Sequence, residues 1–211
     1  MKGESVAVRP AARVPTGDQI LAAARTILHR DGVAQLSTRA VAAEAGVNLS
    51  LIHYYFRSRE GLLLALLERM DADLVARQRS MYARQDITLA EKWAEAIAFY
   101  RDDLKSGYVR TLLELAAYGY ANRRIATEVR KILKRWRDLL AEAAAETLTG
   151  DLNVPLDPKE VGSMVTSYWL GMEMQHLLGV PEEEGALWKT AEKLGQLMGR
   201  WETSKSRRRR K

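Results

Sequence analysis

The sequence predicts an all-α protein with two parts, an N-terminal three-helix domain that contains a helix-turn-helix and a C-terminal helical domain. Apolar side chains recur at three- and four-residue spacing along most of the chain, as one face of an α-helix requires. No segment shows the strict alternation of apolar and polar residues that is typical of a strand. Several segments open with helix-capping residues, which indicate where individual helices begin.

The first domain is predicted to comprise residues 16–60. Residues 1–15 contain two prolines and are expected to form a flexible N-terminal arm. Residues 16–19 have the arrangement of a capping box, and the helix that follows should end at Gly32. Two shorter helices are expected within residues 37–56.

The second domain, residues 61–203, is predicted to consist of longer helices. A helix that begins near Ser58 should run to about Arg84 and so connect the two domains. Thr88 opens the next helix with another capping box, and Asp157 opens a later one with proline at its first position. The expected helices after the connecting one are 88–105, 108–120, 122–143, 158–178 and 182–201.

Residues 37–59 have the pattern of two short helices joined by a tight turn. Ser37 or Thr38 can cap the first helix, Gly46 can form the turn at low steric cost, and Asn48 can cap the second helix. A helix-turn-helix of this kind places its second helix in the major groove of DNA. The segment therefore predicts a DNA-reading element.

The second of these helices has two different faces. Ile52 and Phe56 should pack beneath the preceding helices, whereas the opposite face carries side chains suited to base edges and Arg59 is suited to phosphate. The alternative is an ordinary helical hairpin with an aromatic core, but core packing alone would not require tyrosines opposite Ile52 and Phe56. The candidate DNA-binding residues are Ser37, Thr38, Arg39, Asn48, Leu49, Ser50, Leu51, His53, Tyr54, Tyr55 and Arg59.

Residues 20–64 resemble the N-terminal domain of the TetR-type bacterial transcriptional regulators. The resemblance covers roughly the first third of the chain and is specific, because many positions match in order and at the right spacing. The matching residues are Ile20, Leu21, Ala23, Ala24, Gly32, Thr38, Val41, Ala42, Ala45, Gly46, Val47, Tyr54, Phe56, Ser58, Glu60 and Leu62.

The sequence departs from the family pattern at His53, Tyr55 and Arg59, where Tyr, His and Lys are common. All three residues can still form hydrogen bonds, so these departures bear on the operator sequence more than on DNA binding. Leu51 stands where Thr is frequent, and its side chain can contact a thymine methyl group but cannot hydrogen-bond to a base.

The second domain is rich in aromatic residues and methionine between residues 88 and 178, and such side chains can line a largely apolar ligand pocket. Glu114 lies between two leucines and could receive a cation or a hydrogen-bond donor, although the polar face of an amphipathic helix is the alternative. The candidate ligand-binding residues, each of which could instead be ordinary core, are Trp93, Tyr100, Glu114, Tyr118, Trp136, Met164, Tyr168 and Met172.

Metal and cofactor sites are not expected. Glu173 and His176 lie one helical turn apart and could hold a metal ion or a proton. Two ligands are too few for a metal site, however. The alternative is that Glu173 and His176 form a hydrogen-bonded pair at an interface.

Residues 161–178 are apolar on more than one face, so this helix should be covered on both sides. One cover is expected to be its own domain and the other a second copy of the chain. TetR-type proteins dimerise through their last two long helices, so the resemblance implies a homodimer through about 158–178 and 182–201. A two-fold dimer would bind a palindromic operator in double-stranded DNA.

The net charge of +6 is unevenly distributed along the chain. Residues 1–60 carry a net charge of +3, residues 61–203 carry −3, and the tail 204–211 carries +6. A basic terminus fits a polyanionic partner, and contact with DNA would add salt-sensitive affinity that does not depend on base sequence. A disordered, solvated end is the alternative for this tail.

Composition favours a cytoplasmic protein. The chain has no cysteine, no apolar run long enough to cross a bilayer, and no signal-peptide core near its N-terminus. An enzyme is not expected, because the three histidines lie on separate predicted helices and no glycine-rich phosphate loop is present.

The resemblance implies a ligand-responsive regulator, most often a repressor that a largely apolar small molecule releases from its operator. In that mechanism, the ligand must prefer the state that cannot bind DNA. Some such regulators activate transcription or use the ligand as co-repressor. The sequence does not decide between repression and activation. The alternative function is a sequence-blind nucleic-acid binder that uses the C-terminal arginine tail.

Overall fold

The computed structural model describes residues 16–148, 157–185 and 187–209, and all regular structure in these residues is helical. The chain divides into two compact units, Met1–Leu62 and Leu63–Lys211. The arm predicted for residues 1–15 lies outside the described residues. None of the helices in the described part of the chain is long and apolar enough to span a membrane.

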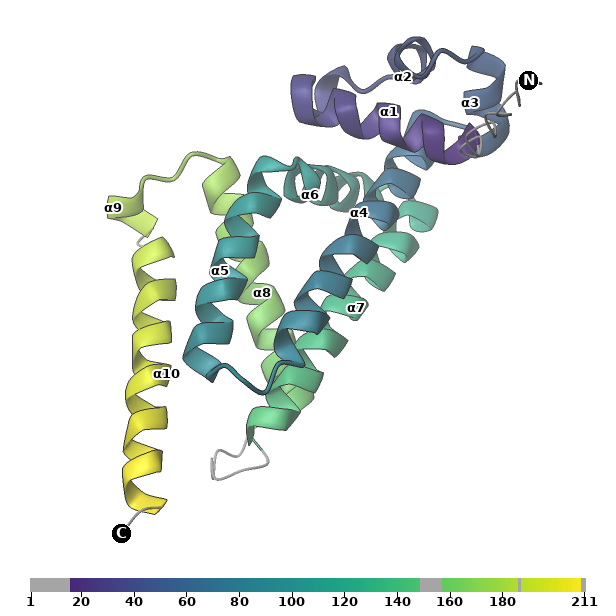
Figure 1. The fold of residues 1–211 in the computed structure, drawn as a ribbon. Coiled ribbons are helices and arrows are strands. Elements are labelled where there is room, and N and C mark those ends of the chain that lie inside the picture. The colour runs from purple at the N-terminus through teal and green to yellow at the C-terminus, as the bar shows by residue number, and fades with distance from the viewer. Residues whose placement is uncertain (1–15, 149–156, 186, 210–211) are drawn as a thin grey trace, which may run out of the picture. The chain divides into compact units, whose positions relative to one another are not determined.

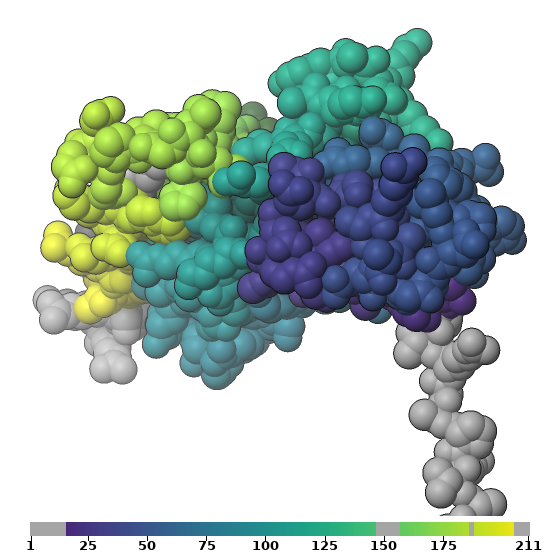
Figure 2. Space-filling view, turned by 90° about the horizontal axis from the view of Figure 1, so that it is seen from above, coloured from purple at the N-terminus to yellow at the C-terminus, as the bar shows by residue number. Residues whose placement is uncertain are grey.

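The first unit contains three α-helices and one short 3₁₀ turn. The helices are α1 (Thr16–Asp31), α2 (Thr38–Ala45) and α3 (Leu49–Phe56), and η1 (Val33–Gln35) joins α1 to α2. Figure 2 shows these residues, coloured purple to blue, as one closely packed body. The unit has a core of its own, because each of its helices and the segment after η1 contributes a fully buried side chain: Ile20, Ala24, Leu36, Val41 and Ile52.

Helix α4 (Arg59–Tyr82) begins in the first unit and continues into the second. The second unit adds α5 (Leu89–Lys105), α6 (Tyr108–Gly119), α7 (Arg123–Leu148), α8 (Pro158–Leu177), the short α9 (Glu182–Gly185) and α10 (Leu187–Arg209). Helices α7 and α8 pack against each other along much of their length, and α10 lies alongside α5 (Figure 1).

Local capping signals place the starts of several helices where the sequence predicts them. The capping boxes at Thr88 and Asp157 are both complete, with Glu91 and Glu160 returning hydrogen bonds to the capping residues. The Asn122 side chain accepts hydrogen bonds from two backbone N–H groups in the first turn of α7. The structure therefore confirms these helix starts. They could be predicted from the sequence because capping depends on neighbours within three residues.

The C-terminal helix differs from the prediction of one helix over 182–201. Residues 182–185 form the separate turn α9, and the Glu182 carboxylate accepts hydrogen bonds from the N–H groups of Trp188 and Lys189 at 3.2 and 3.0 Å. An acidic group therefore caps the positive end of α10, but from outside that helix. Helix α10 extends to Arg209, so residues 204–209 continue the helix instead of forming a separate tail.

A buried carboxylate joins three helices of the second unit. Asp71 of α4 is fully buried and accepts hydrogen bonds from the Tyr108 hydroxyl of α6 and the Trp136 indole N–H of α7, both at 2.8 Å. Arg135 of α7 adds an ion pair at 2.7 Å. Several hydrogen bonds and a cation thus compensate for removing this charge from water.

Close packing of α7 against α8 depends on a glycine. A Cβ atom at Gly162 would lie 2.5 Å from the Arg137 carbonyl oxygen and 2.9 Å from the Ala141 nitrogen. Because both atoms belong to the α7 backbone, they cannot move aside as a flexible side chain would. We expect Gly162→Ala to lower the free energy of unfolding by about 1–3 kcal/mol, the usual cost of inserting an extra methyl group into a well-packed core. Urea titrations followed by circular dichroism measure this change.

Gly199→Ala is the matched control, since a Cβ atom there would meet only the Ala90 methyl group at an ordinary 3.5 Å. This variant should keep or slightly raise stability, because alanine favours helix over glycine. Equal stability of both variants would contradict the close contact at Gly162.

Candidate functional site

Three capping residues define the start of α2, the turn after it and the start of α3. The Ser37 hydroxyl accepts a hydrogen bond from the Ala40 N–H at 3.1 Å, and Asn48 accepts one from the Ser50 N–H at 2.9 Å. Between them, Gly46 ends α2 in the left-handed conformation with φ 64°. In that conformation a side chain would strain the backbone, so glycine suits this turn. The predicted helix-turn-helix is therefore present.

Helix α3 presents one face to the core and the other to solvent, as the sequence predicts. Ile52 is fully buried, whereas Tyr54 is 78% exposed. Contact of the exposed face with DNA stays a prediction. Of the candidate DNA-binding residues, Thr38, Leu49 and Arg59 are half-buried, and the exposed ones are Ser37, Arg39, Asn48, Ser50, Leu51, His53, Tyr54 and Tyr55.

The two neighbouring tyrosines of α3 differ in their surroundings. Their rings meet edge to face with centroids 5.2 Å apart. The Tyr55 ring also lies against α1, where a Cβ atom built on Gly17 would be 3.6 Å from it. Tyr55 thus supports Tyr54 from the side of the domain, and Tyr54 is the side chain of this pair that projects furthest into solvent.

Arg59 has a role inside the domain that the sequence prediction did not include. Its guanidinium donates hydrogen bonds to the backbone carbonyls of Val33 and Leu36, both at 2.7 Å. These bonds tie the first turn of α4 to the segment before the helix-turn-helix. Arg57, by contrast, is exposed and ends α3 with φ 67°, an uncommon conformation for a residue with a side chain.

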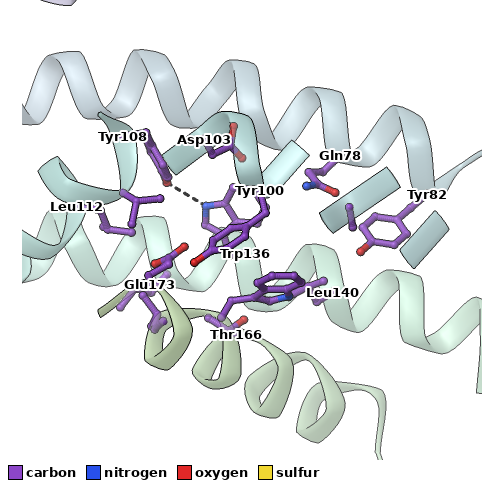
Figure 3. Close-up of a pocket in the computed structure, with 15 residues that line it drawn as sticks. Gln78, Tyr82, Tyr100, Asp103, Tyr108, Leu112, Trp136, Leu140, Thr166 and Glu173 are labelled. Carbon is purple, nitrogen blue, oxygen red and sulfur yellow. Dashed lines mark hydrogen bonds between the residues drawn. The ribbon is translucent and has the colours of Figure 1, made fainter. Parts of the chain in front are cut away.

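The second unit contains a cavity of about 70 Å³ between α4, α5, α6, α7 and α8 (Figure 3). Its wall is mostly aromatic and aliphatic, which matches the composition of small-molecule pockets. The aromatic residues and the principal polar residues of this wall are Gln78, Tyr82, Tyr100, Asp103, Tyr108, Trp136, Thr166, Trp169 and Glu173.

Two of the candidate ligand-binding residues, Tyr100 and Trp136, line this cavity. The others lie elsewhere, so the cavity gives them no ligand contact. The Trp93 indole donates to the Ala191 carbonyl between α5 and α10 at 2.7 Å, and Met172 is buried away from the cavity wall. Tyr168 is half-buried outside the wall, and the exposed residues are Glu114, Tyr118 and Met164.

Three buried polar atoms at the cavity have no hydrogen-bond partner. They are Oε1 of Gln78, the hydroxyl of Tyr100 and Oε2 of Glu173. Each unsatisfied group of this kind costs free energy that a ligand could recover by bonding to it. The cavity therefore has an apolar wall and a few polar groups able to orient a ligand.

Glu173 is a cavity residue that was not predicted as a ligand contact, although its helical spacing from other cavity residues is visible in the sequence. Thr166, Trp169, Leu170 and Glu173 fall at helical spacing on one side of α8, and all four line the cavity. His176, considered as a partner of Glu173, is exposed. No cluster of metal-ligating side chains occurs among the residues that the structure describes.

Burial shifts the pKa values of the acidic groups at the cavity. It raises the pKa of Glu173 to about 8, and the neighbouring carboxylate of Asp103 adds to this rise. Burial also raises the pKa of Asp103, while the guanidinium of Arg77, 2.7 Å away, opposes that shift. The pKa of Tyr100 rises because its hydroxyl is buried and lies near Glu173.

The Glu173 shift predicts a pH-dependent stability. Between pH 4.5 and about 8 the folded protein keeps a proton on Glu173 that the unfolded chain has released. The contribution of this proton to the free energy of unfolding is fully present below pH 4.5 and is lost as pH rises through the pKa of Glu173 in the folded protein. We expect the free energy of unfolding to fall by about 3 kcal/mol more in the wild type than in Glu173→Gln from pH 5 to 8.

Urea titrations at the two pH values test this expectation. The Gln variant is a suitable reference because it keeps the shape of the side chain but cannot ionise. The same pH dependence in both proteins would mean that the Glu173 carboxyl group is in contact with water in the folded state.

Comparison with known proteins gives a family match for the first unit and similar folds for most of the chain. The model of "Bacterial regulatory proteins, tetR family" matches residues 20–66, which include α2, the turn and α3. No curated protein matches this sequence. Many solved structures have a similar fold.

Three of these structures illustrate the likeness. A TetR transcription regulator from Haloarcula marismortui is 18% identical with a TM-score of 0.68, and covers 87% of this chain and 97% of its own. FadR from Bacillus subtilis, in complex with stearoyl-CoA, is 21% identical with a TM-score of 0.65, and covers 84% of this chain and 96% of its own. SmeT, in complex with triclosan, is 22% identical with a TM-score of 0.63, and covers 85% of this chain and 89% of its own.

The matched segment is the helix-turn-helix unit described above, and the similar structures extend over the helices of the second unit as well. The first unit of this all-α chain therefore matches the tetR-family model over its helix-turn-helix, and the chain as a whole has the fold of TetR-type transcriptional regulators.

Proposed function

We propose that this TetR-type regulator is a ligand-responsive repressor that binds a palindromic operator as a homodimer in the bacterial cytoplasm. A small molecule that enters the cavity of the second unit would release it from DNA. The observation that carries this proposal is the combination of an exposed aromatic face on α3 with a cavity that holds unpartnered polar atoms.

The exposed face of α3 suits direct readout of bases. Ser50, Leu51 and Tyr54 would meet base edges, with Leu51 against a thymine methyl group. The N–H groups at the start of α2 and the exposed guanidinium of Arg57 would meet phosphates. Arg59 would act indirectly, because its guanidinium is engaged with backbone carbonyls inside the domain.

Exposed apolar side chains on the last long helices support the homodimer. On α8, Met164 is 59% exposed and Leu178, at its C-terminal end, is 74% exposed. Met174 of α8 and Leu197 of α10 are also exposed. A two-fold dimer through these helices would cover such side chains and present two α3 helices to half-sites roughly 34–36 Å apart, or at a multiple of that spacing.

The cavity supports control by a small molecule. Stearoyl-CoA bound to FadR and triclosan bound to SmeT show that regulators of similar fold can hold ligands. In this chain Gln78 and Tyr82 of α4 line the cavity, and α4 is the helix that begins with Arg59. A ligand that displaces α4 would change the DNA-binding state, and DNA would weaken ligand binding by the same factor.

Substitution of Tyr54 tests direct readout. Tyr54→Ala should cost about 1–3 kcal/mol on the preferred duplex and relax base preference near its contact. Fluorescence anisotropy at one fixed salt concentration, on a duplex selected from a genomic fragment pool, measures the loss. Tyr120→Ala is the control, since that tyrosine is 94% exposed but lies in the second unit. Equal losses would refute the assignment to α3.

A chain that ends at Thr203 tests the alternative function in the same assay. The proposed repressor should keep its palindromic site after this truncation. A sequence-blind binder would lose most of its affinity on truncation, would show no preferred site, and would tolerate Tyr54→Ala.

Alanine substitutions of Arg57 and Arg59 are expected to change different properties of the protein. Arg59→Ala removes two hydrogen bonds, so it should lower the free energy of unfolding by about 1–3 kcal/mol and weaken binding to all duplexes alike. Arg57→Ala should leave the melting temperature unchanged and reduce the salt dependence of DNA binding by about one phosphate contact. If Arg59→Ala instead reduced the salt dependence without destabilising the protein, a direct phosphate contact would be the correct role.

A further inference from the structure

Glu173 is the unusual group in the cavity. Its side chain is only 8% exposed, it projects from α8 into the cavity, and its Oε2 atom has no hydrogen-bond partner. In Figure 3 its carboxylate points toward the same region of the cavity as the hydroxyl of Tyr100, which is also unpartnered. A buried acid in this condition is costly unless something bonds to it.

The other buried acids among the described residues of this unit have partners. Asp103, which also lines the cavity, is paired with Arg77 at 2.7 Å, and the Arg77 guanidinium stacks on the Phe99 ring. Asp71 is paired with Arg135 and bonded to Tyr108 and Trp136. These acids are satisfied by the protein itself, whereas Oε2 of Glu173 is not.

The walls around Glu173 are aromatic. Tyr100 and Trp169 line the cavity with ring centroids 4.6 Å apart, and Tyr82, Tyr108 and Trp136 complete the aromatic part of the wall. Aromatic faces attract cations electrostatically, most strongly where water is excluded. They also accept the apolar body of a ligand.

We propose that the cavity of the second unit binds a hydrophobic amine, whose ammonium group meets Glu173 and the Tyr100 hydroxyl and whose apolar body lies among the aromatic side chains. Gln78, which reaches the cavity from α4, offers a further acceptor for a ligand N–H group. This inference rests on the proposed function, because it names the chemical class of effector for the same cavity.

Charge distinguishes this ligand from the two alternatives. An anion would be buried beside Glu173 and Asp103 and would gain no cation from the cavity wall. A neutral carbonyl compound could accept a hydrogen bond from protonated Glu173, but it would leave the acceptor of Gln78 without a donor. An ammonium group supplies both the countercharge and the donors.

Ammonium binding should release a proton from Glu173. The other titratable groups on the cavity wall are Tyr82, Tyr100 and Asp103 of α4 and α5 and Tyr108 of α6. Burial raises the pKa of each of them, so the tyrosines stay neutral near pH 7. Because the pKa of Glu173 is about 8, affinity for an ammonium probe should rise by up to about tenfold per pH unit between pH 6 and 7.

Calorimetric titration of the full-length protein tests the proposal. The probes are a series of arylalkylammonium ions (benzyl-, 2-phenylethyl-, 3-phenylpropyl- and 4-phenylbutylammonium), with 4-phenyl-2-butanone as the neutral comparison and 3-phenylpropanoate as the anion. The variants are Glu173→Gln and, as control, Glu114→Gln, which changes an exposed carboxylate of α6 in the same way. Circular dichroism confirms that each variant is folded.

At least one ammonium ion should bind more tightly than the ketone and the carboxylate. Glu173→Gln should weaken that binding at least about tenfold and abolish its pH dependence, while Glu114→Gln leaves both unchanged. The proposal is overturned if no ammonium ion binds the folded wild type, if the neutral or anionic probe binds more tightly, or if the two variants behave alike.

DNA release is measured separately, so the two proposals can fail independently. Ammonium binding that depends on Glu173 but leaves operator affinity unchanged would support the ligand class and contradict the ligand-responsive repressor. Release from the operator by the ketone or the carboxylate, without any effect of the amines, would support the repressor and overturn the amine.

Discussion

The second unit depends on the buried carboxylate of Asp71. A carboxylate without water must be compensated on several sides, and here a phenol, an indole and a guanidinium converge on it from α6 and α7. Loss of any one partner would leave charge or hydrogen-bonding capacity buried, which is among the larger penalties in folded proteins. The interaction therefore selects one arrangement of α4 relative to α6 and α7 within this unit. Because Tyr108 and Trp136 also line the cavity, it fixes part of the cavity wall.

Asp71 and Glu173 show two outcomes for an acid in the same helical unit. Asp71 is surrounded by donors and is structural, since nothing further can bond to it easily. Glu173 is buried among aromatic groups with an oxygen atom left unpartnered, and the pKa of its carboxyl group rises accordingly. Proteins retain such unsatisfied, perturbed groups most often where they act on something else. This contrast makes Glu173 the informative polar residue of the cavity.

Features set by neighbouring residues could be predicted from the sequence. The capping boxes at Thr88 and Asp157 and the left-handed turn at Gly46 depend on residues within one helical turn, and the orientation of α3 follows from helical periodicity. The separate turn α9 was missed, because the Glu182 carboxylate caps α10 from beyond the intervening residues.

The cavity could be predicted only in part, because its wall depends on contacts between distant segments. Glu114 and Glu173 both lie among apolar residues in the sequence, yet packing exposes the first and buries the second. Tyr100 and Trp136 were identified by residue type alone, and the same criterion also selected Trp93 and Tyr118, which lie elsewhere. Arg59 matched a basic family position, but its partners Val33 and Leu36 are more than twenty residues away.

The separate core of the first unit bears on how the protein could change over evolutionary time. Ile20, Leu36, Val41 and Ile52 are fully buried within the first unit, so the folding of that unit does not use the side chains of the cavity in the second unit. Under the proposed function, exchange of the exposed residues of α3 would redirect the protein to a new operator without altering the ligand that it binds. Replacement of the cavity residues would alter the ligand and leave the operator unchanged.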